Sequence, residues 1–191
     1  MTDSHSPYRR GRWYWEEFSA TASGAGADLA ALRRGLGQEA GGVPELWPYH
    51  RCVLPEYVAE EGHRDYRLTA EHAALTLFAV HQQHQQQPMH VAGVGTGVAL
   101  RALRKSEKFS EEAVDRRVNA AATSTDTAEL VHHLRGLVTQ LRGIRQPLDY
   151  TRLYRDIRDW HFPEGQERVR RSWGAQYYAW TAASGDRPAA S

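Results

Sequence analysis

Helical periodicity is clearest between residues 97 and 143, which read GVALRALRKSEKFSEEAVDRRVNAAATSTDTAELVHHLRGLVTQLRG. Ser110 and Asp126 each precede a Glu-containing first turn, as N-cap residues do. Beyond Asp126, apolar residues recur every three or four positions, at Leu130, Leu134, Leu137, Val138 and Leu141. This spacing places them on one face of an α-helix. We therefore expect helices over residues 110–121 and 126–143.

The same periodicity recurs along the rest of the chain, and no window alternates polar and apolar residues in the manner of a β-strand. Thr69 is the expected N-cap of another helix, and Pro147 and Pro163 mark turns. The sequence thus predicts an all-α fold of about nine helices. The further expected ranges are 9–22, 28–36, 50–61, 69–83, 97–105, 149–160 and 164–181.

A polar connection rich in Gln, His and Gly separates residues 83 and 97. Long connections of this kind often mark a boundary between packed units. We expect two packed helical-bundle lobes, an N-terminal one over residues 1–96 and a C-terminal one over residues 97–183. Residues 1–7 and the tail 184–191 are small, polar or Pro-bearing, so we expect both to be frayed or disordered.

The composition is that of a folded chain: 191 residues, 41% hydrophobic and 25% charged. No apolar run approaches the roughly 20 residues that a membrane helix needs. The N-terminus lacks the pattern of a secretory signal. Cys52 stands alone, which excludes an intrachain disulfide and Cys-based zinc sites. These features favour a cytoplasmic protein.

Charge is unevenly distributed although the net charge is only +1. Residues 39–71 hold three Arg against seven acidic residues. Residues 101–117 hold six basic against four acidic residues, and residues 129–159 have the same balance. Such asymmetry predicts one face for a polyanion. The chain is less basic than stand-alone DNA-binding domains, so we expect weak affinity for nucleic acid in the isolated protein.

Two basic stripes are the candidate phosphate-binding surfaces. Arg101, Arg104, Lys105 and Lys108 are spaced so that a continued helix would place them on one side. A second stripe holds His132, Arg135, Thr139 and Arg142. The helix at 149–160 is discounted, because Arg152 and Arg155 each have an aspartate four residues on. The alternative interpretation is that these stripes are ordinary solvated faces.

No catalytic or metal site emerges from the pattern. The glycines at 93, 95 and 97 follow no strand and precede no Gly-Lys-Ser/Thr, so we expect a flexible loop that starts a helix. His81 and His84 share a helix face but lack acidic neighbours, and His133 is expected to pack beside the core. Cys52 is expected to be buried. We predict a protein that is not an enzyme and needs no cofactor or metal.

Aromatic residues are mostly assigned to the core. Tyr14 and Phe18 are expected to pack, while Trp13, which lies near several arginines, is left open between packing and base stacking. Four C-terminal residues follow core spacing and are expected to close the second lobe: Val169, Trp173, Tyr177 and Trp180.

Several short motifs in a fixed order resemble the CasB family, the small subunit of the type I-E CRISPR Cascade complex. They are ALRALR at 99–104, VDRRV at 114–118, HLRGLV at 133–138 and PLDYTRLYRDIRDW at 147–160. In the first half, Trp15, AALRRG at 30–35 and the apolar segment 75–80 look similar in order and spacing. The resemblance spans residues 13–178, while the Gln/His-rich segment 81–90 departs from it.

The resemblance implies an all-α, non-catalytic subunit that lies as a pair beside the large subunit and the crRNA-bearing backbone of Cascade. There its basic surface would stabilise the displaced strand and the guide–target duplex of the R-loop, and support the nuclease-helicase. By position, the residues that look like the family's basic residues are Arg33, Arg34, Arg116, Arg117 and Arg135. Arg101, Arg104, Lys105, Lys108 and Arg142 rest on the stripe argument instead.

Two other hypotheses remain. A protein–protein scaffold would use the charged faces to meet other subunits, with no direct contact to nucleic acid. A small helical hydrolase would hold a metal through His81, His84 or His90.

Overall fold

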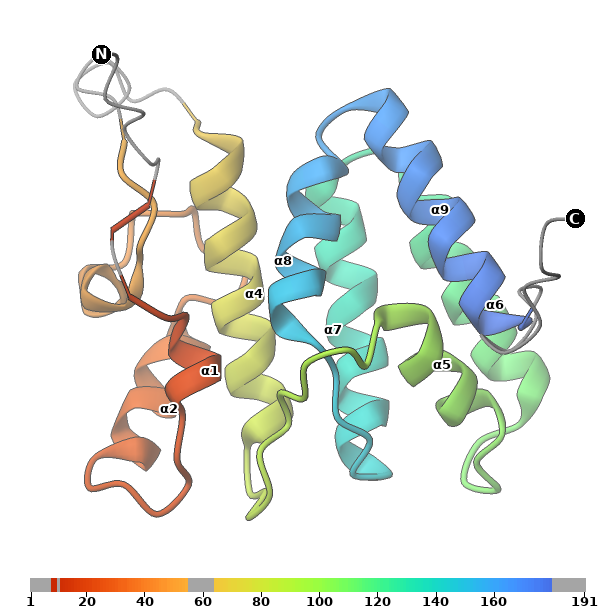
Figure 1. Cartoon of the computed structure of the whole chain (residues 1–191), viewed down its shortest axis with the longest axis horizontal. Helices are drawn as coiled ribbons and strands as arrows, with labels where there is room; N and C mark the ends of the chain where they lie inside the picture. Colours follow the sequence, from red (N-terminus) through yellow and green to blue (C-terminus); the bar gives the residue numbers. More distant parts are fainter. Residues whose placement is uncertain (1–7, 10, 55–63, 180–191) are drawn as a thin grey trace, which may run out of the picture.

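The computed structural model describes residues 8–9, 11–54 and 64–179, and within them the chain forms helices and no β-strand (Figure 1). The predicted all-α class is confirmed, as is the predicted number of about nine helices. The elements are α1 (Tyr14–Glu17), α2 (Ala25–Arg34), the 3-10 helix η1 (Pro44–Tyr49), α4 (Tyr66–Gln82), α5 (Thr96–Arg104), α6 (Glu111–Ala122), α7 (Thr127–Gly143), α8 (Tyr150–Asp159) and α9 (Pro163–Tyr177).

Helix α4 is the central element of the fold. It packs against α1 and α2 on one side and against α7 and α8 on the other (Figure 1). Every residue from Ala70 to Gln82 is buried, as expected of a helix covered on all sides. The helix begins before the predicted Thr69, because the side chain of Asp65 accepts hydrogen bonds from the backbone N–H groups of Arg67 (2.7 Å) and Leu68 (3.1 Å).

The helices of the second half begin at the predicted caps. Ser110 accepts the backbone N–H of Ala113 (3.3 Å), and Asp126 accepts that of Glu129 (2.8 Å). The apolar stripe of α7 is buried throughout, as its spacing predicted. Among the described residues, the ends of α5 to α8 lie within one residue of the expected ranges.

The glycine-rich segment before α5 starts that helix, as predicted, and also permits close packing. A Cβ atom on Gly97 would lie 2.5 Å from the carbonyl oxygen of Trp173 on α9. One on Gly95 would lie 2.8 Å from the side chain of Gln176. Because these glycines have no side chains, the backbone at the start of α5 packs directly against α9. The sequence did not predict this packing role.

Two predicted helices in the first half are wrong in the described residues. The helix expected over 9–22 is reduced to α1, and residues 50–54 of the one expected over 50–61 are not helical. Cys52 instead forms an isolated antiparallel bridge with Tyr8. The physical reason is that these residues bond to other segments. Glu71 on α4 accepts the backbone N–H groups of Arg51 (2.5 Å) and Cys52 (2.8 Å), and the Arg51 carbonyl oxygen accepts the backbone N–H of Arg9 (2.8 Å) instead of one from a helix. Residues 55–61 lie outside the described part.

Smaller differences concern α2 and α9. Helix α2 begins at Ala25, three residues before the predicted start, and α9 ends at Tyr177. The buried residues Val169, Trp173 and Tyr177 confirm the expected apolar face of α9, whereas Trp180 lies outside the described residues. So do the terminal segments 1–7 and 184–191 that we expected to be frayed or disordered.

A single hydrophobic cluster extends from Trp15 on α1 to Tyr177 on α9. It includes residues on both sides of position 96, since α4 packs directly on α7 and α8. The division into lobes at that position stays a prediction. No helix in the described part of the chain is long and apolar enough to cross a membrane.

Candidate nucleic-acid interface

Arg104 is held by two carboxylates at the corner between α5 and α6. Its Nη2 lies 2.8 Å from Glu111 Oε2, and its Nε lies 2.9 Å from Asp115 Oδ1. The hydroxyl of Tyr177 on α9 also donates to Asp115 (2.5 Å). Desolvation acts to raise the pKa of Asp115, but the hydrogen bonds from Tyr177 and Arg104 outweigh it and lower that pKa. The charge of Arg104 is therefore largely neutralised by these two carboxylates.

The first predicted stripe does not lie on one helix. Helix α5 ends at Arg104 with Lys105 as its C-cap, so Lys108 falls in the loop that follows. There the Lys108 ammonium donates to the carbonyl oxygen of Gly143 (2.9 Å) at the end of α7, where a cation is favoured. The prediction that one helix continues from Arg101 to Lys108 is therefore wrong.

Arg142 from the second stripe also has an internal role. Its guanidinium donates to the carbonyl oxygen of Val80 (3.1 Å) and to Gln83 Oε1 (2.8 Å). These contacts join the end of α7 to the end of α4, and they turn Arg142 partly away from solvent.

Other predicted residues remain available to a ligand. Lys105, Arg116, Arg117 and Arg135 are exposed, Arg33 and Arg101 are half-buried, and none of these six forms an ion pair within the described residues. Arg34 lies 3.8 Å from Glu45, with both side chains more than half exposed, so that pair contributes little. Helices α2 and α6 lie at opposite ends of the molecule (Figure 1), so the structure does not bring the ten predicted residues into one patch.

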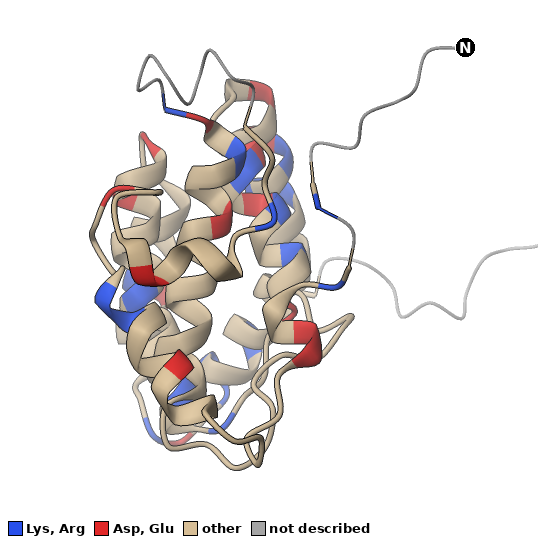
Figure 2. Cartoon of the chain, turned by 90° about the vertical axis from the view of Figure 1, so that its left-hand side faces the viewer, with Lys and Arg blue, Asp and Glu red and all other residues tan. Residues whose placement is uncertain are grey.

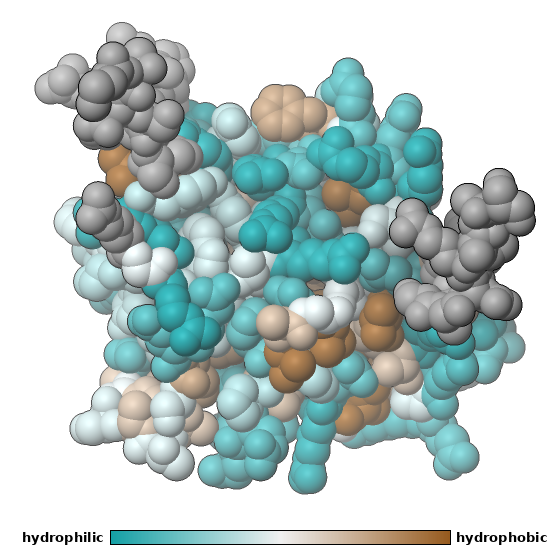
Figure 3. Space-filling view, in the orientation of Figure 1, coloured by the Kyte–Doolittle hydropathy of each residue, from teal (hydrophilic) through white to brown (hydrophobic). Residues whose placement is uncertain are grey.

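Charges of both signs are interspersed on the side of the molecule that carries α1 and α2 (Figure 2). The face shown in Figure 3 is mostly hydrophilic, with apolar residues gathered near its centre. On the side shown in Figure 2, Lys and Arg positions are separated by Asp and Glu positions. Phosphate contacts on that side would therefore come from individual side chains.

The i, i+4 spacing of Arg155 and Asp159 predicts an ion pair between them. Asp159 instead pairs with Arg158 (2.8 Å) and Arg168 (2.7 Å). Arg155 is exposed and has no ion pair within the described residues, and the same holds for Arg171 on α9. Both are basic positions that the stripe argument missed, because spacing alone does not show which of several arginines a carboxylate will choose.

The buried histidines and the cysteine occupy structural settings. His81 is buried with its Nδ1 2.9 Å from the Tyr150 hydroxyl, and His90 Nδ1 accepts the backbone N–H of Tyr150 (3.0 Å). In the described part of the chain no three His, Cys, Asp or Glu side chains are placed to hold a metal ion. Cys52 is buried, as predicted, and desolvation raises the pKa of its thiol to about 12.

The N-terminal aromatic residues pack as predicted, and Trp13 joins them. Tyr14 and Phe18 lie against Phe78 at ring separations of 6.1 and 5.4 Å. Trp13 stacks on Trp15 at 5.1 Å, and the guanidinium carbon of Arg51 lies 4.5 Å from the Trp13 ring. That cation–π contact occupies the face that base stacking would have needed.

Comparison with known proteins identifies the family. The model of the CRISPR-associated protein Cse2 family matches residues 28–178. The crystal structure of CasB from Thermobifida fusca is 32% identical and aligns over 81% of this chain and 85% of its own, with a TM-score of 0.63. A chain described as part of a CRISPR RNA-guided surveillance complex is 23% identical, with the same coverage and a TM-score of 0.55, which shows a shared fold. No curated protein matches. The chain therefore belongs to the CRISPR-associated Cse2 family.

Proposed function

We propose that this chain is a non-catalytic small subunit of a type I-E CRISPR Cascade complex. In that role it binds nucleic acid without sequence specificity and stabilises the R-loop, both the displaced strand and the crRNA–target duplex. Its partners are the large subunit, the crRNA-bound backbone subunits and a second copy of itself. It supports the nuclease-helicase indirectly and performs no chemical step.

Family membership over residues 28–178 is the observation that carries this proposal. The similarity to CasB from Thermobifida fusca, and the shared fold with a chain of an RNA-guided surveillance complex, point in the same direction. The exposed arginines are consistent with it, because a guanidinium forms bidentate contacts with phosphate and is always charged.

Modest affinity is sufficient for such a subunit. Strand exchange in an R-loop is nearly balanced, so a few contacts to the backbone shift its equilibrium. Neighbouring subunits would hold the basic residues at a high effective concentration beside the nucleic acid. A net charge of +1 is therefore compatible with the role.

Within this proposal the predicted basic residues divide into three groups. Lys105, Arg116, Arg117 and Arg135 are the foremost phosphate contacts, because they are exposed and free of ion pairs in the described structure. Arg33, Arg34 and Arg101 are secondary contacts. Arg104, Lys108 and Arg142 chiefly hold helices together through the contacts described above.

The alternative function is a protein–protein scaffold without direct contact to nucleic acid. The scaffold function is favoured by the contacts of Arg104, Lys108 and Arg142, since these side chains already bond to other groups of the protein. The interspersed charges on the α1–α2 side also suit contacts with another protein (Figure 2).

A salt titration separates the two functions. Binding of the purified chain to labelled single-stranded DNA is measured for the wild type, for the double variant Arg116→Ala/Arg117→Ala, and for Arg168→Ala. Arg168 is an exposed arginine on α9 that is paired with Asp159, which makes it a matched control. Each lost phosphate contact flattens the slope of log affinity against log salt by about 0.7.

We expect the double variant to lower that slope by about 1.4 while Arg168→Ala leaves it nearly unchanged. Circular dichroism confirms that each variant is folded. Equal slopes for all three proteins would remove Arg116 and Arg117 from the interface. If the folded wild type binds no DNA, and the double variant prevents assembly with the other subunits, the scaffold function holds instead.

A further inference from the structure

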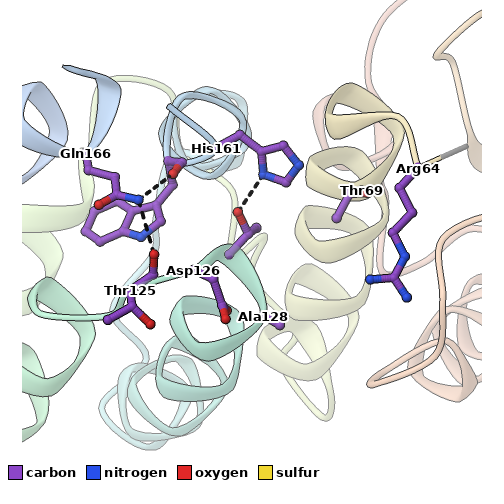
Figure 4. A pocket seen from close by; sticks show the side chains of 9 residues that line it. Arg64, Thr69, Thr125, Asp126, Ala128, His161 and Gln166 are labelled. Atoms are coloured by element: carbon purple, nitrogen blue, oxygen red, sulfur yellow. Dashed lines mark hydrogen bonds between the residues drawn. The ribbon is translucent and has the colours of Figure 1, made fainter. Parts of the chain in front are cut away.

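A cavity of about 420 Å³ opens between the start of α4, the start of α7 and the turn that joins α8 to α9 (Figure 4). This volume is within the range of small-molecule sites, roughly 300–1,000 Å³. None of the predicted phosphate-binding residues lines it. The residues on its walls include Arg64, Thr69, Ala128, Trp160 and His161.

Aromatic rings lead from the wall of this cavity to the surface. Trp160 has no exposed surface, whereas His161 is exposed. The His161 ring lies 5.8 Å from that of Tyr66 and 6.4 Å from that of Phe162. Phe162 itself is 46% exposed, although an apolar side chain of this size is normally covered. Together these rings offer faces on which a planar group can stack.

Hydrogen bonds fix the polar parts of the walls. Gln166 Nε2 donates to the carbonyl oxygens of Trp160 (3.0 Å) and Thr125 (3.4 Å), and the Thr127 hydroxyl lies 2.7 Å from His161 Nδ1 (Figure 4). The Trp160 indole N–H is buried and has no partner in the described structure. This atom has almost no accessible surface, so it forms part of the wall and does not itself contact a ligand.

The described residues that line the cavity carry one cation, Arg64, and one anion, Asp126, so a phosphate is attracted only where it lies next to Arg64. Arg64 contributes a cation whose side chain is 80% exposed. It pairs with Glu39 at 2.9 Å, but Glu39 is also largely exposed, so exchanging that partner for a phosphate costs little. The carboxylate of Asp126, also on the wall, accepts the backbone N–H of Glu129 as a helix cap. One cation beside one anion disfavours polyphosphates.

We propose that this cavity holds an unpaired base of single-stranded nucleic acid, stacked on the ring of His161 with Phe162 at the rim and the adjoining phosphate beside Arg64. The inference rests on the proposed function and deepens it. Exposed arginines elsewhere hold the strand through its phosphates, while this cavity distinguishes a single strand from a duplex, in which the bases are already paired. Burial lowers the pKa of His161, which keeps its ring neutral near pH 7 and able to stack without charge.

The test compares two probes that differ only in their bases. One is a fluorescently labelled thymidine oligonucleotide, and the other has the same length but abasic residues in place of the thymidines. Phosphate contacts bind both probes alike, whereas base stacking acts on the first alone. Stacking of a base on an aromatic side chain increases the affinity several-fold. We therefore expect the wild type to bind the thymidine probe about 5-fold or more tightly than the abasic probe.

Two variants then locate the preference. Ala128→Leu narrows the cavity from α7 with an aliphatic side chain, at a position where the native side chain is exposed, and His161→Ala removes the stacking ring. Both should bring the preference close to 1 while the affinity for the abasic probe stays unchanged. Tyr178→Ala is the control, because Tyr178 is an aromatic residue that is 49% exposed at the C-cap of α9, the opposite end of that helix from the cavity. Thermal melts verify that all variants are folded.

The outcomes separate this inference from the function on which it rests. Equal binding of both probes by the wild type, or a preference that survives in both cavity variants, overturns the base site and leaves phosphate binding intact. If the folded wild type binds neither probe, both the base site and the proposed nucleic-acid-binding function are overturned. A uridine probe in a further arm shows whether RNA or the displaced DNA strand is the better source of the base.

Discussion

The indole N–H of Trp173 on α9 donates to a carboxylate oxygen of Asp156 on α8, at 2.8 Å. The Thr96 hydroxyl, at the first turn of α5, lies 3.3 Å from the same oxygen. One aspartate thus ties three helices together beside the Gly97 contact. Its carboxylate is largely withdrawn from water, and this desolvation raises its pKa to about 6 despite the opposing hydrogen bonds.

Asp156 gives stability a defined dependence on pH. Because its pKa in the folded state exceeds the ordinary value of 3.8, the stabilisation is fully present below pH 3.8 and is lost as pH rises through about 6. Asp156→Asn keeps an acceptor for Trp173 but removes the charge. At pH 8 the variant should be more stable than the wild type by on the order of 1–3 kcal/mol, and this advantage should shrink toward pH 4.

Denaturant unfolding at pH 4, 6 and 8 measures this difference. The variant must be compared with the wild type at each pH, because burial lowers the pKa of His50 and His81 to about 4, and their contribution to stability runs the opposite way. A difference between Asp156→Asn and the wild type that is constant across the three pH values would contradict the prediction.

Glu71 should anchor the extended segment beside α4. Glu71→Ala leaves the buried backbone N–H groups of Arg51 and Cys52 without acceptors and opens a void, so we expect a loss of about 2–4 kcal/mol in unfolding free energy. Amide hydrogen exchange reports it locally, as faster exchange at these two positions. Thr76→Ala on the same helix removes only a bond to the helix's own backbone and should leave both amides protected.

Gly97 should tolerate no larger side chain. In Gly97→Ala the new methyl group would meet the backbone of Trp173, which cannot move aside cheaply, so we expect a loss of about 1–3 kcal/mol. Gly136 on α7 offers the contrast, because a Cβ there meets nothing within 4 Å. Gly136→Ala should raise stability by about 0.5–1 kcal/mol through helix propensity. Thermal and denaturant unfolding of both variants would show opposite signs.

Arg142 should matter for stability and little for binding. Arg142→Ala removes the donor to Val80 and Gln83, with an expected loss of about 1 kcal/mol in unfolding free energy. The slope of DNA affinity against salt should stay at the wild-type value. A folded Arg142→Ala protein whose slope falls as it does in Arg116→Ala/Arg117→Ala would return Arg142 to the phosphate-binding surface.

Elements stabilised by local signals were predictable from the sequence. Helix α7 is an example, since its cap Asp126 and its apolar stripe both lie within the segment itself. Residues 50–54 were not predictable, because their conformation depends on Glu71, some twenty positions further along the chain. The sequence of an apolar helix such as α4 does not indicate that its single carboxylate, Glu71, binds the backbone of another segment.

The same limit governs the candidate interface. The sequence identified the arginines, but which of them are free depends on contacts made after folding. Arg104 is taken by Asp115, and Asp159 selects Arg168 from a different helix instead of Arg155. The cavity near Trp160 was not predictable from the sequence either, because its walls come from segments that are about one hundred residues apart.

Cys52, the chain's one thiol, is a built-in reporter of motion, because its buried sulfur lies 3.9 Å from Asp65 Oδ1 at the start of α4. A reagent can modify this sulfur only in molecules in which that packing has opened, and its high pKa slows the reaction further. The modification rate, measured with and without bound DNA or neighbouring subunits, therefore measures how often the packing around Cys52 opens. Because the native thiol reacts slowly, a dye can be attached to a cysteine introduced elsewhere without first removing Cys52.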